Sequence, residues 1–310
     1  MSLLSNQTDA LDRAGKLDRE ELEKRLGVME KTEGRILGAI YNGDTYGKMN
    51  MLLYSNPAGI VAGLTAAVKL SQAQGAVLVT DCEINEQEYM AAAGTAGLDL
   101  VIEKAAMVNK AAHKKDRMMT FEELAALAER LMGREPGIFA AVDEEVPVEA
   151  APDTPVTELL GTEDYRGILT GHQFYSREQL KGLKIKDLKT WGGYIQTIRP
   201  SDCVVDLAAK DVLVLRRKCC GKCTFCREGL YQISRILEQV SQGRGTMEGL
   251  NLAREIGQAM EVSCNCSLGD RAGVPAVSML EAISFRTSAI INVLASQEYY
   301  YSTGFMKGNG

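Results

Sequence analysis

Histidine is almost absent from this chain, whose 310 residues include only two, His113 and His172. Neither has a cysteine within several residues, so the sequence offers no Cys2His2 zinc site. Acid–base catalysis that depends on histidine also has little material to use, and we predict no catalytic residue.

Long apolar runs, an export signal and an excess of positive charge are also missing. No apolar run approaches the length of a bilayer span. The first residues, Met1 to Gln7, contain no basic region followed by an apolar core. The formal net charge is −6, which argues against nucleic acid and against an anionic membrane surface as partners. We therefore expect a cytoplasmic protein with no transmembrane segment and no nucleic-acid partner.

The glycines lack the spacing that a phosphate-binding loop needs. Gly43, Gly47, Gly59 and Gly63 lie close together. None of them forms a G-x-G-x-x-G or P-loop pattern after a strand, the spacing that directs several backbone N–H groups at one anion. We interpret these four glycines as turn residues.

Cysteine, in contrast, is plentiful, with eight residues in the chain. In a protein without an export signal, eight cysteines are more typical of metal ligands or thiols than of a disulfide framework. Six of the eight lie in two short stretches, residues 219–226 and 264–266. Cys82 and Cys203 lie apart from both stretches and carry no signal of their own.

The spacing of these cysteines predicts a metal site. Cys220, Cys223 and Cys226 follow a C-x2-C-x2-C pattern, which allows three thiolates of one loop to converge. The second stretch offers Cys264 or Cys266 as a fourth ligand. Three cysteines on one loop and a distant fourth are a common way to hold a [4Fe–4S] cluster.

Two other interpretations of the cysteines stay open. A structural zinc site usually pairs one C-x2-C with a second C-x2-C or with two histidines, and neither pair is present. Cys219 and Cys264 are either alternative ligands or redox thiols beside the cluster, or simply small buried residues, as free cysteines often are.

The length of the chain predicts two or three cores, and its patterning divides it into four regions. Residues 1–34 form a helical segment, and residues 35–134 alternate between strands and helices. Residues 135–199 read as a small β-grasp-like module, and residues 200–310 form a helical metal-binding domain with a C-terminal tail. The expected fold class is α+β, multidomain.

The predicted elements follow from hydrophobic periodicity and turn chemistry. Strands are expected at 36–41, 76–80, 137–142, 146–150, 167–171 and 194–198, and helices at 17–30, 57–72, 86–93, 121–132, 154–160 and 203–218, followed by three helical stripes at 230–240, 250–260 and 275–294. The helix at 17–30 either packs on its own domain or docks a partner subunit.

Local signals refine these expectations. Thr120 and Glu123 are spaced as a capping box, and Ser201 or Asp202 is expected to cap the helix that begins at Cys203. We interpret Trp191 as a packing residue, and the tail 298–310 as poorly ordered or bound to a partner.

Over residues 201–290 the chain resembles the iron–sulfur domain of the NADH-binding flavoprotein subunit of respiratory complex I. The same domain occurs in related subunits of soluble hydrogenases and formate dehydrogenases. The family pattern C-G-K-C-T-P-C-R-E-G is similar to Cys220–Gly229, and its later C-x-L-G is matched by Cys266–Gly269. The resemblance implies that Cys220, Cys223, Cys226 and Cys266 are the cofactor-binding and metal ligands of a [4Fe–4S] cluster.

Upstream the resemblance is weaker. Residues 140–190 look like the family's β-grasp module, and 43–47 and 56–63 are similar to a piece of its flavin domain. The flavin-cradling run G-R-G-G-x-G-F-P-T-G and the later G-E-E-T-A-L are absent. Residues 35–134 therefore resemble a degenerate flavin-type domain, and we do not expect FMN or NADH to bind.

The resemblance implies an electron-transfer subunit that relays single electrons through its cluster within a multisubunit cytoplasmic oxidoreductase complex. Its partners would be other redox subunits, either flavoproteins or further iron–sulfur proteins. One alternative is a flavin-dependent NAD(P)H dehydrogenase subunit with an atypical FMN site. Another is a structural assembly subunit whose fold is stabilised by its metal, since bound metal supplies folding free energy.

Overall fold

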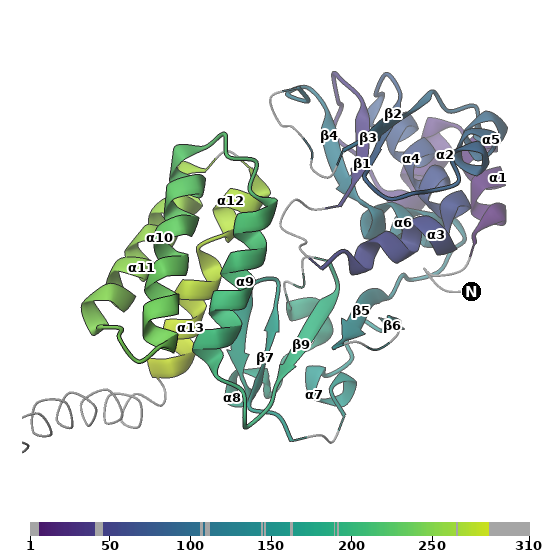
Figure 1. Ribbon diagram of the computed structural model, residues 1–310. Helices are drawn as coiled ribbons and strands as arrows, with labels where there is room; N and C mark the ends of the chain where they lie inside the picture. The colour runs from purple at the N-terminus through teal and green to yellow at the C-terminus, as the bar shows by residue number, and fades with distance from the viewer. Residues whose placement is uncertain are drawn as a thin grey trace, which may run out of the picture. The chain divides into compact units, whose positions relative to one another are not determined.

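The computed structural model describes residues 6–40, 46–105, 108, 112–143, 145, 147–161, 164–188, 190, 192–264 and 266–284 (Figure 1). The chain separates into two compact units. The α/β unit comprises Met1–Glu163, Gln179–Thr197 and Cys266–Leu268, and the helical unit comprises Asp164–Glu178, Ile198–Asn265 and Gly269–Gly310. The four regions expected from the sequence, with boundaries after residues 34, 134 and 199, stay predictions. The α+β, multidomain fold class is confirmed, since both units combine helices with strands.

A parallel sheet lies at the centre of the α/β unit. Its strands are β1 (Ile36–Ala39), β2 (Ala76–Thr80), β3 (Leu100–Lys104) and β4 (Arg117–Thr120), in the order β3-β2-β1-β4. Every neighbouring pair in this sheet is parallel. The sequence predicted β1 and β2, whose residues are all buried. It did not predict β3 and β4, which are short and partly exposed.

Helices supply the rest of the hydrophobic core of this unit. They are α1 (Thr8–Lys16), α2 (Arg19–Leu26), η1 (Lys48–Asn50), α3 (Met51–Ser55), α4 (Pro57–Ser71), α5 (Glu86–Ala96) and α6 (Phe121–Leu131). Helix α4 packs against α1, α5 and α6 and is buried along nearly its whole length. Asn56 begins it by accepting a hydrogen bond from the N–H of Gly59 at 2.9 Å, and Pro57 fits the first turn.

Two of the glycines interpreted as turn residues lie inside α4, so that prediction was wrong for Gly59 and Gly63. A Cβ added at Gly63 would lie 2.2 Å from the carbonyl oxygen of Leu124, so only glycine allows α4 and α6 to approach this closely. Gly47 does occupy a turn, with φ +67°. Gly43 lies outside the described residues.

The N-terminal helical segment contains two helices where one was predicted. Helix α2 ends at Gly27, whose φ is +83°, so the predicted helix stops before residue 30. Leu22 is fully buried, and α2 contacts α4 and α6. Packing on its own unit therefore accounts for the apolar stripe of α2. The predicted capping box of α6 is confirmed, because Thr120 accepts a hydrogen bond from the N–H of Glu123 and Glu123 accepts one from the N–H of Thr120.

The β-grasp-like region follows. Its elements in chain order are β5 (Ile138–Val142), β6 (Val148–Ala150), α7 (Val156–Leu159), β7 (Gly167–Thr170), β8 (Gln173–Ser176), α8 (Arg177–Leu180), η2 (Ile185–Asp187) and β9 (Tyr194–Ile198). Strand β5 pairs with β6 antiparallel and with β9 parallel, while β7 and β8 form an antiparallel hairpin. The order matches the predicted module, to which β8 is an addition. Trp191 lies outside the described residues.

The helical unit is built from α9 (Val204–Lys218), α10 (Thr224–Ser241), α11 (Met247–Ser263) and α13 (Val274–Ser284), with the short α12 (Ser267–Arg271) before α13. The four longer helices were predicted, although the extension of the last one to residue 294 and the tail 298–310 lie outside the described residues. The predicted cap of α9 was wrong. Cys203 is the N-cap residue, and the carboxylate of Asp202 accepts from the N–H of Arg199 at 2.7 Å instead.

Helices α9, α10 and α11 pack side by side in an antiparallel arrangement (Figure 1). The guanidinium of Arg216, at the end of α9, lies 4.9 Å from the ring centre of Tyr231 on α10. At the other end of the pair, Ser241 donates a hydrogen bond to Asp206. A Cβ at Gly229 on α10 would contact Met260 on α11. The beginning of α10 and the end of α11 therefore lie at the same end of the unit.

Across the described residues, no single helix has both the length and the apolar composition needed to cross a bilayer. Residues 48–55 and α4 meet at a bend, and only taken together do they have the length and apolar composition of a membrane span. Helix α4 is a buried core helix of the α/β unit.

Candidate metal centre

The first cysteine stretch forms the short turn between α9 and α10. Cys219 ends α9, and Cys223 is the N-cap residue of α10, with an extended backbone at φ −90° and ψ 120°. Between them Gly221 has φ +74°, a left-handed conformation that glycine adopts without the steric penalty of a Cβ. This glycine allows the chain to reverse direction within a few residues.

The three cysteines of the C-x2-C-x2-C pattern differ in exposure. Cys220 is exposed, Cys223 is half-buried and Cys226 is buried, at 3% exposure. Cys223 and Cys226 lie one helical turn apart at the start of α10, on the same side of the helix end. The first N–H groups of a helix have no partner within the helix and form the positive end of its dipole. This position therefore favours a negatively charged group at the start of α10.

Cys219 lies against this group. Its Sγ atom is 3.4 Å from the Sγ of Cys226, and it accepts a hydrogen bond from the N–H of Gly221 at 3.4 Å. Cys219 is half-buried. Of the two sequence interpretations, the contact favours a thiol beside the site.

The second cysteine stretch meets the first at Gly269. Cys264 ends α11. A Cβ added at Gly269 would lie 2.5 Å from the Cβ of Cys264, 3.0 Å from its Sγ and 3.7 Å from the Cβ of Cys226. The chain at Gly269 thus packs directly on both cysteines, and the absence of a side chain there is what allows it.

The structure brings only some of the predicted cysteine ligands close to one another. Cys226 has Cys219 and Cys264 close to it, whereas Cys220 is exposed and Cys266 is half-buried just before α12. Within the described ranges, no three His, Cys, Asp or Glu side chains are grouped closely enough to hold a metal ion.

The donor set nevertheless fits a [4Fe–4S] cluster. Two cysteine stretches approach one another at Gly269, they carry thiolate donors only, and one of them begins a helix. A cluster with four thiolate ligands needs these donors and carries net negative charge, which the positive end of α10 favours.

Basic side chains are concentrated at the same end of the helical unit. The last turn of α9 contains Arg216, Arg217 and Lys218. Lys222 lies in the turn between α9 and α10, and Arg227 lies in the first part of α10. All five side chains are exposed. The Arg227 guanidinium pairs with Glu228 at 2.8 Å and donates to the carbonyl oxygen of Gly221 at 3.1 Å, so it also braces the turn.

A buried polar pair that the sequence did not reveal supports α9. Nδ1 of His172, in the turn of the β7–β8 hairpin, lies 2.9 Å from a carboxylate oxygen of Asp211 on α9, and both side chains are almost fully buried. No sequence signal could have found the pair, because its members are 39 residues apart and belong to elements of different type.

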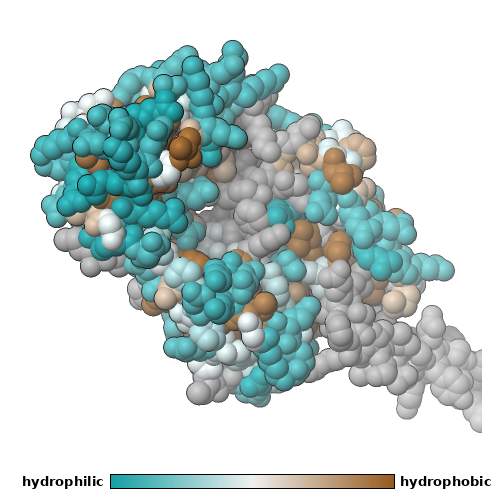
Figure 2. All heavy atoms as spheres, turned by 180° about the vertical axis from the view of Figure 1, so that it is seen from behind, coloured by the Kyte–Doolittle hydropathy of each residue, from teal (hydrophilic) through white to brown (hydrophobic). Residues whose placement is uncertain are grey.

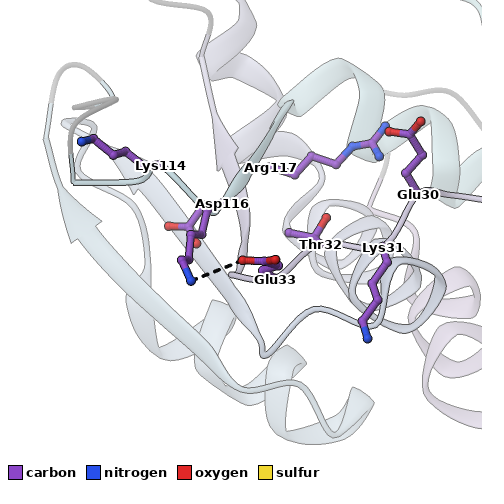
Figure 3. A pocket seen from close by; sticks show the side chains of 8 residues that line it. Glu30, Lys31, Thr32, Glu33, Lys114, Asp116 and Arg117 are labelled. Carbon is purple, nitrogen blue, oxygen red and sulfur yellow. Dashed lines mark ion pairs between the residues drawn. The ribbon is translucent and has the colours of Figure 1, made fainter.

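The α/β unit has a hollow of its own, of about 460 Å³. Figure 3 shows acidic and basic side chains around it, and a dashed line marks the ion pair between Lys115 and Glu33 at 3.3 Å. Its lining residues are Glu30, Lys31, Thr32, Glu33, Lys114, Lys115, Asp116 and Arg117. Side chains of both charges line the hollow, which opens broadly to solvent.

The helical unit is similar to a region of known iron–sulfur proteins. Residues 206–288 match the family model described as the NADH-ubiquinone oxidoreductase-F iron–sulfur binding region. The NADH-quinone oxidoreductase F subunit of Streptomyces coelicolor is 32% identical over 87 residues, which cover 28% of this chain and 19% of that protein. The NADP-reducing hydrogenase subunit HndC of Solidesulfovibrio fructosivorans is 26% identical over 99 residues, covering 32% of this chain and 20% of that protein.

The similarity in fold to known structures extends beyond residues 206–288. A chain of the NAD⁺-reducing [NiFe]-hydrogenase in its H2-reduced state superposes with a TM-score of 0.66 and 16% identity, over 89% of this chain and 60% of that one. The present chain thus matches about a fifth of the length of the curated relatives and 60% of the hydrogenase chain.

The family match confirms the predicted [4Fe–4S] cofactor, and the relatives support an electron-transfer oxidoreductase subunit. The chain resembles the NADH-binding flavoprotein subunits of NADH-quinone oxidoreductases and hydrogenases, and the resemblance is closest in its C-terminal iron–sulfur binding region.

Proposed function

We propose that this chain is an electron-relay subunit of a multisubunit oxidoreductase complex. Cys220, Cys223, Cys226 and Cys266 would hold the [4Fe–4S] cluster, which supplies one-electron chemistry when bound. The observation that carries the proposal is the position of the cysteines. The family match falls on the segment in which two cysteine stretches meet at Gly269, at the positive end of α10.

The chain's own residues hold and tune the ligands. The burial of Cys226 removes water from one side of the site. Helix α10 has its unpaired N–H groups at the end where Cys223 and Cys226 lie. Lys222 and Arg227 place positive charge beside them. Positive charge and N–H donors near a cluster favour its reduced, more negative state and raise its potential.

The partners would be other redox subunits, either flavoproteins or further iron–sulfur proteins. The relatives are named as subunits of NADH-quinone oxidoreductase and of an NADP-reducing hydrogenase, and a relay by itself has no electron source. We do not propose FMN or NADH as cofactors of this chain, because the glycine spacing that holds the flavin phosphate in the family is missing from its sequence.

Metal and flavin analysis of anaerobically purified protein tests this proposal. We expect brown protein with broad visible absorption, about four irons and four sulfides per chain, and an EPR signal after reduction with dithionite. Colourless protein with one zinc per chain would contradict the relay and support a structural metal. Stoichiometric FMN together with NADH oxidation by the chain alone would support the dehydrogenase alternative.

A further inference from the structure

The end of the helical unit that carries the cysteines has an unusual surface. We define the cysteine end as residues 216–228, which join α9 to α10, together with residues 261–264 at the end of α11. The antiparallel packing of the three helices brings these two segments to one end of the unit (Figure 1).

Positive charge dominates this surface, although the chain as a whole has a net charge of −6. Residues 216–228 contain five basic side chains and one acidic side chain, Glu228, and residues 261–264 add one exposed acidic side chain, Glu261. Glu228 is engaged by Arg227 at 2.8 Å. In the part of the chain that the structure describes, Arg217 and Lys222 have no acidic partner. The exposed positive charge of Arg217 and Lys222 is therefore uncompensated among the described residues.

Helix stability explains only part of this charge. Basic residues in the last turn of α9 interact favourably with the negative end of its dipole, which accounts for Arg216, Arg217 and Lys218. Lys222 and Arg227 flank the start of α10, where a positive charge opposes the dipole and where the first turn contains no acidic residue. Arg227 is paired with Glu228 within α10, so the charge left to be balanced is that of Lys222. A bound cluster supplies some of the balancing negative charge, and an acidic partner surface would supply the rest.

The same end exposes two apolar side chains. Phe225, which lies between Cys223 and Cys226, is 58% exposed, and Val262, two residues before Cys264, is 83% exposed. On the face drawn in Figure 2, hydrophilic residues cover most of the coloured surface and hydrophobic ones appear as small separate spots. Exposed apolar side chains among charged ones are typical of a protein–protein interface. Its small extent fits the transient encounters of electron-transfer proteins, which bury less than about 1,200 Å².

We propose that the cysteine end is the docking surface for an acidic one-electron carrier protein. Phe225 and Val262 would form its centre, and Arg217, Lys222 and Arg227 would attract the carrier electrostatically. This inference rests on the proposed function. In the encounter one electron passes between the carrier's redox centre and the cluster, so one centre is oxidised by one electron and the other is reduced by one. No covalent bond forms or breaks.

Stopped-flow electron transfer tests the docking surface with the full, cluster-loaded chain. The probe is reduced plant-type [2Fe–2S] ferredoxin, an acidic carrier, and cytochrome c, a basic carrier, reacts with the dithionite-reduced chain as the opposite-charge comparison. We expect the ferredoxin rate constant to fall at least about tenfold between about 0.01 and 0.3 M ionic strength, since steering by charge is screened by salt. We expect a flat or rising dependence with cytochrome c.

Charge reversal sharpens the test. Arg217→Glu should lower the ferredoxin rate constant about tenfold at low ionic strength, without changing iron content or the midpoint potential by EPR titration beyond a small shift. Arg244→Glu makes the same change of charge at the opposite end of α10 and is the matched control, with an expected rate equal to that of the unmodified chain. Phe225→Ser keeps every charge and should slow transfer at high salt as well.

The outcomes separate the two proposals. A chain that contains no iron–sulfur cluster overturns the proposed function. A loaded chain whose ferredoxin rate is independent of salt, or equal in the Arg217→Glu and Arg244→Glu variants, overturns the docking surface alone. A cluster-loaded chain that reacts faster with cytochrome c than with ferredoxin at low salt also overturns the docking surface alone.

Discussion

The sulfur atoms of Cys219 and Cys226 lie 3.4 Å apart at the point where α9 gives way to α10. This separation is longer than a disulfide bond of about 2.05 Å and short enough for the two thiols to share a hydrogen bond. Cys226 is one of the predicted cluster ligands, and Cys219 lies outside the family's pattern of ligands. The two sulfurs therefore place a reactive neighbour directly beside a ligand.

We predict that iron-free protein forms a Cys219–Cys226 disulfide under mild oxidation. With diamide as the oxidant, the two thiols lose two electrons and two protons to it as the S–S bond forms. Peptide mapping of alkylated protein should show the linked pair, and the oxidised protein should take up less iron on reconstitution. Cys219→Ser should load normally after the same treatment, while Cys203→Ser, which changes a cysteine outside both stretches, should behave like the unmodified chain. Equal linkage of Cys226 in the Cys219→Ser variant, to any partner, would contradict the prediction.

The assignment of the fourth ligand is tested by a pair of substitutions in the second stretch. We expect Cys266→Ser to abolish or severely disturb the EPR signal and to lower iron content, because a thiolate ligand is removed. Cys264→Ser should retain the signal, since Cys264 packs against Gly269 and serine is no larger. If instead Cys264→Ser loses the cluster and Cys266→Ser keeps it, Cys264 is the ligand.

The close approach of α4 and α6 predicts a cost for Gly63→Ala. The added methyl group would lie 2.2 Å from a backbone oxygen of Leu124, and backbone cannot move aside as a flexible side chain does. We expect the free energy of unfolding to fall by about 1–3 kcal/mol, the usual cost of overpacking. Urea denaturation followed by circular dichroism measures it.

Gly94→Ala is the matched control for this change. Gly94 lies in α5 with no heavy atom within 4 Å of the added Cβ, and alanine is favoured over glycine in a helix by about 1 kcal/mol. This variant should therefore be as stable as the unmodified protein or more so. A loss of stability equal to that of Gly63→Ala would show that helix packing is not the cause.

The buried carboxyl group of Glu122 leads us to predict that the stability of the α/β unit depends on pH. Burial raises the pKa of its carboxyl group above the ordinary value, although the group accepts a hydrogen bond from the N–H of Phe139 at 2.9 Å. The folded state then binds the proton more tightly than the unfolded state. The contribution of Glu122 to stability is therefore fully present below its ordinary pKa and is lost as pH rises through the raised value.

Glu122→Gln should remove this dependence, because the amide oxygen still accepts from Phe139 and carries no charge to desolvate. We expect the melting temperature of the variant to exceed that of the unmodified protein at neutral pH and to approach it in acid. Thermal melts from about pH 4 to pH 8, a range that spans the ordinary and raised pKa values of a buried carboxyl group, provide the measurement. A variant that is less stable than the unmodified protein at neutral pH would show that the charge is needed there.

Much of the fold could be predicted because local signals were strong. The strands at 76–80 and 194–198 were predicted with their observed ends, since each is a run of mainly apolar or β-branched residues followed by a turn. Helix α6 was predicted from its capping box. The elements that were missed had weaker patterns. Helix α1 buries mostly alanine, and β4 consists of Arg117 to Thr120, with a charged residue and two methionines.

At the candidate site, spacing predicted the cysteines but not their neighbours. The contact of Cys219 with Cys226 depends on where α9 ends and on the left-handed backbone of Gly221, and neither is encoded in the interval between cysteines. Asp202 was expected to cap α9, yet it closes the preceding turn at Arg199. Such competition between two nearby backbone donors is decided by the path of the chain, which the sequence pattern does not contain.

The buried pair of His172 and Asp211 has a mechanical consequence. Separating two side chains that are so fully buried leaves a polar group without its partner, at a cost of about 1–3 kcal/mol. The pair therefore holds the β7–β8 hairpin against α9, the helix that ends at Cys219.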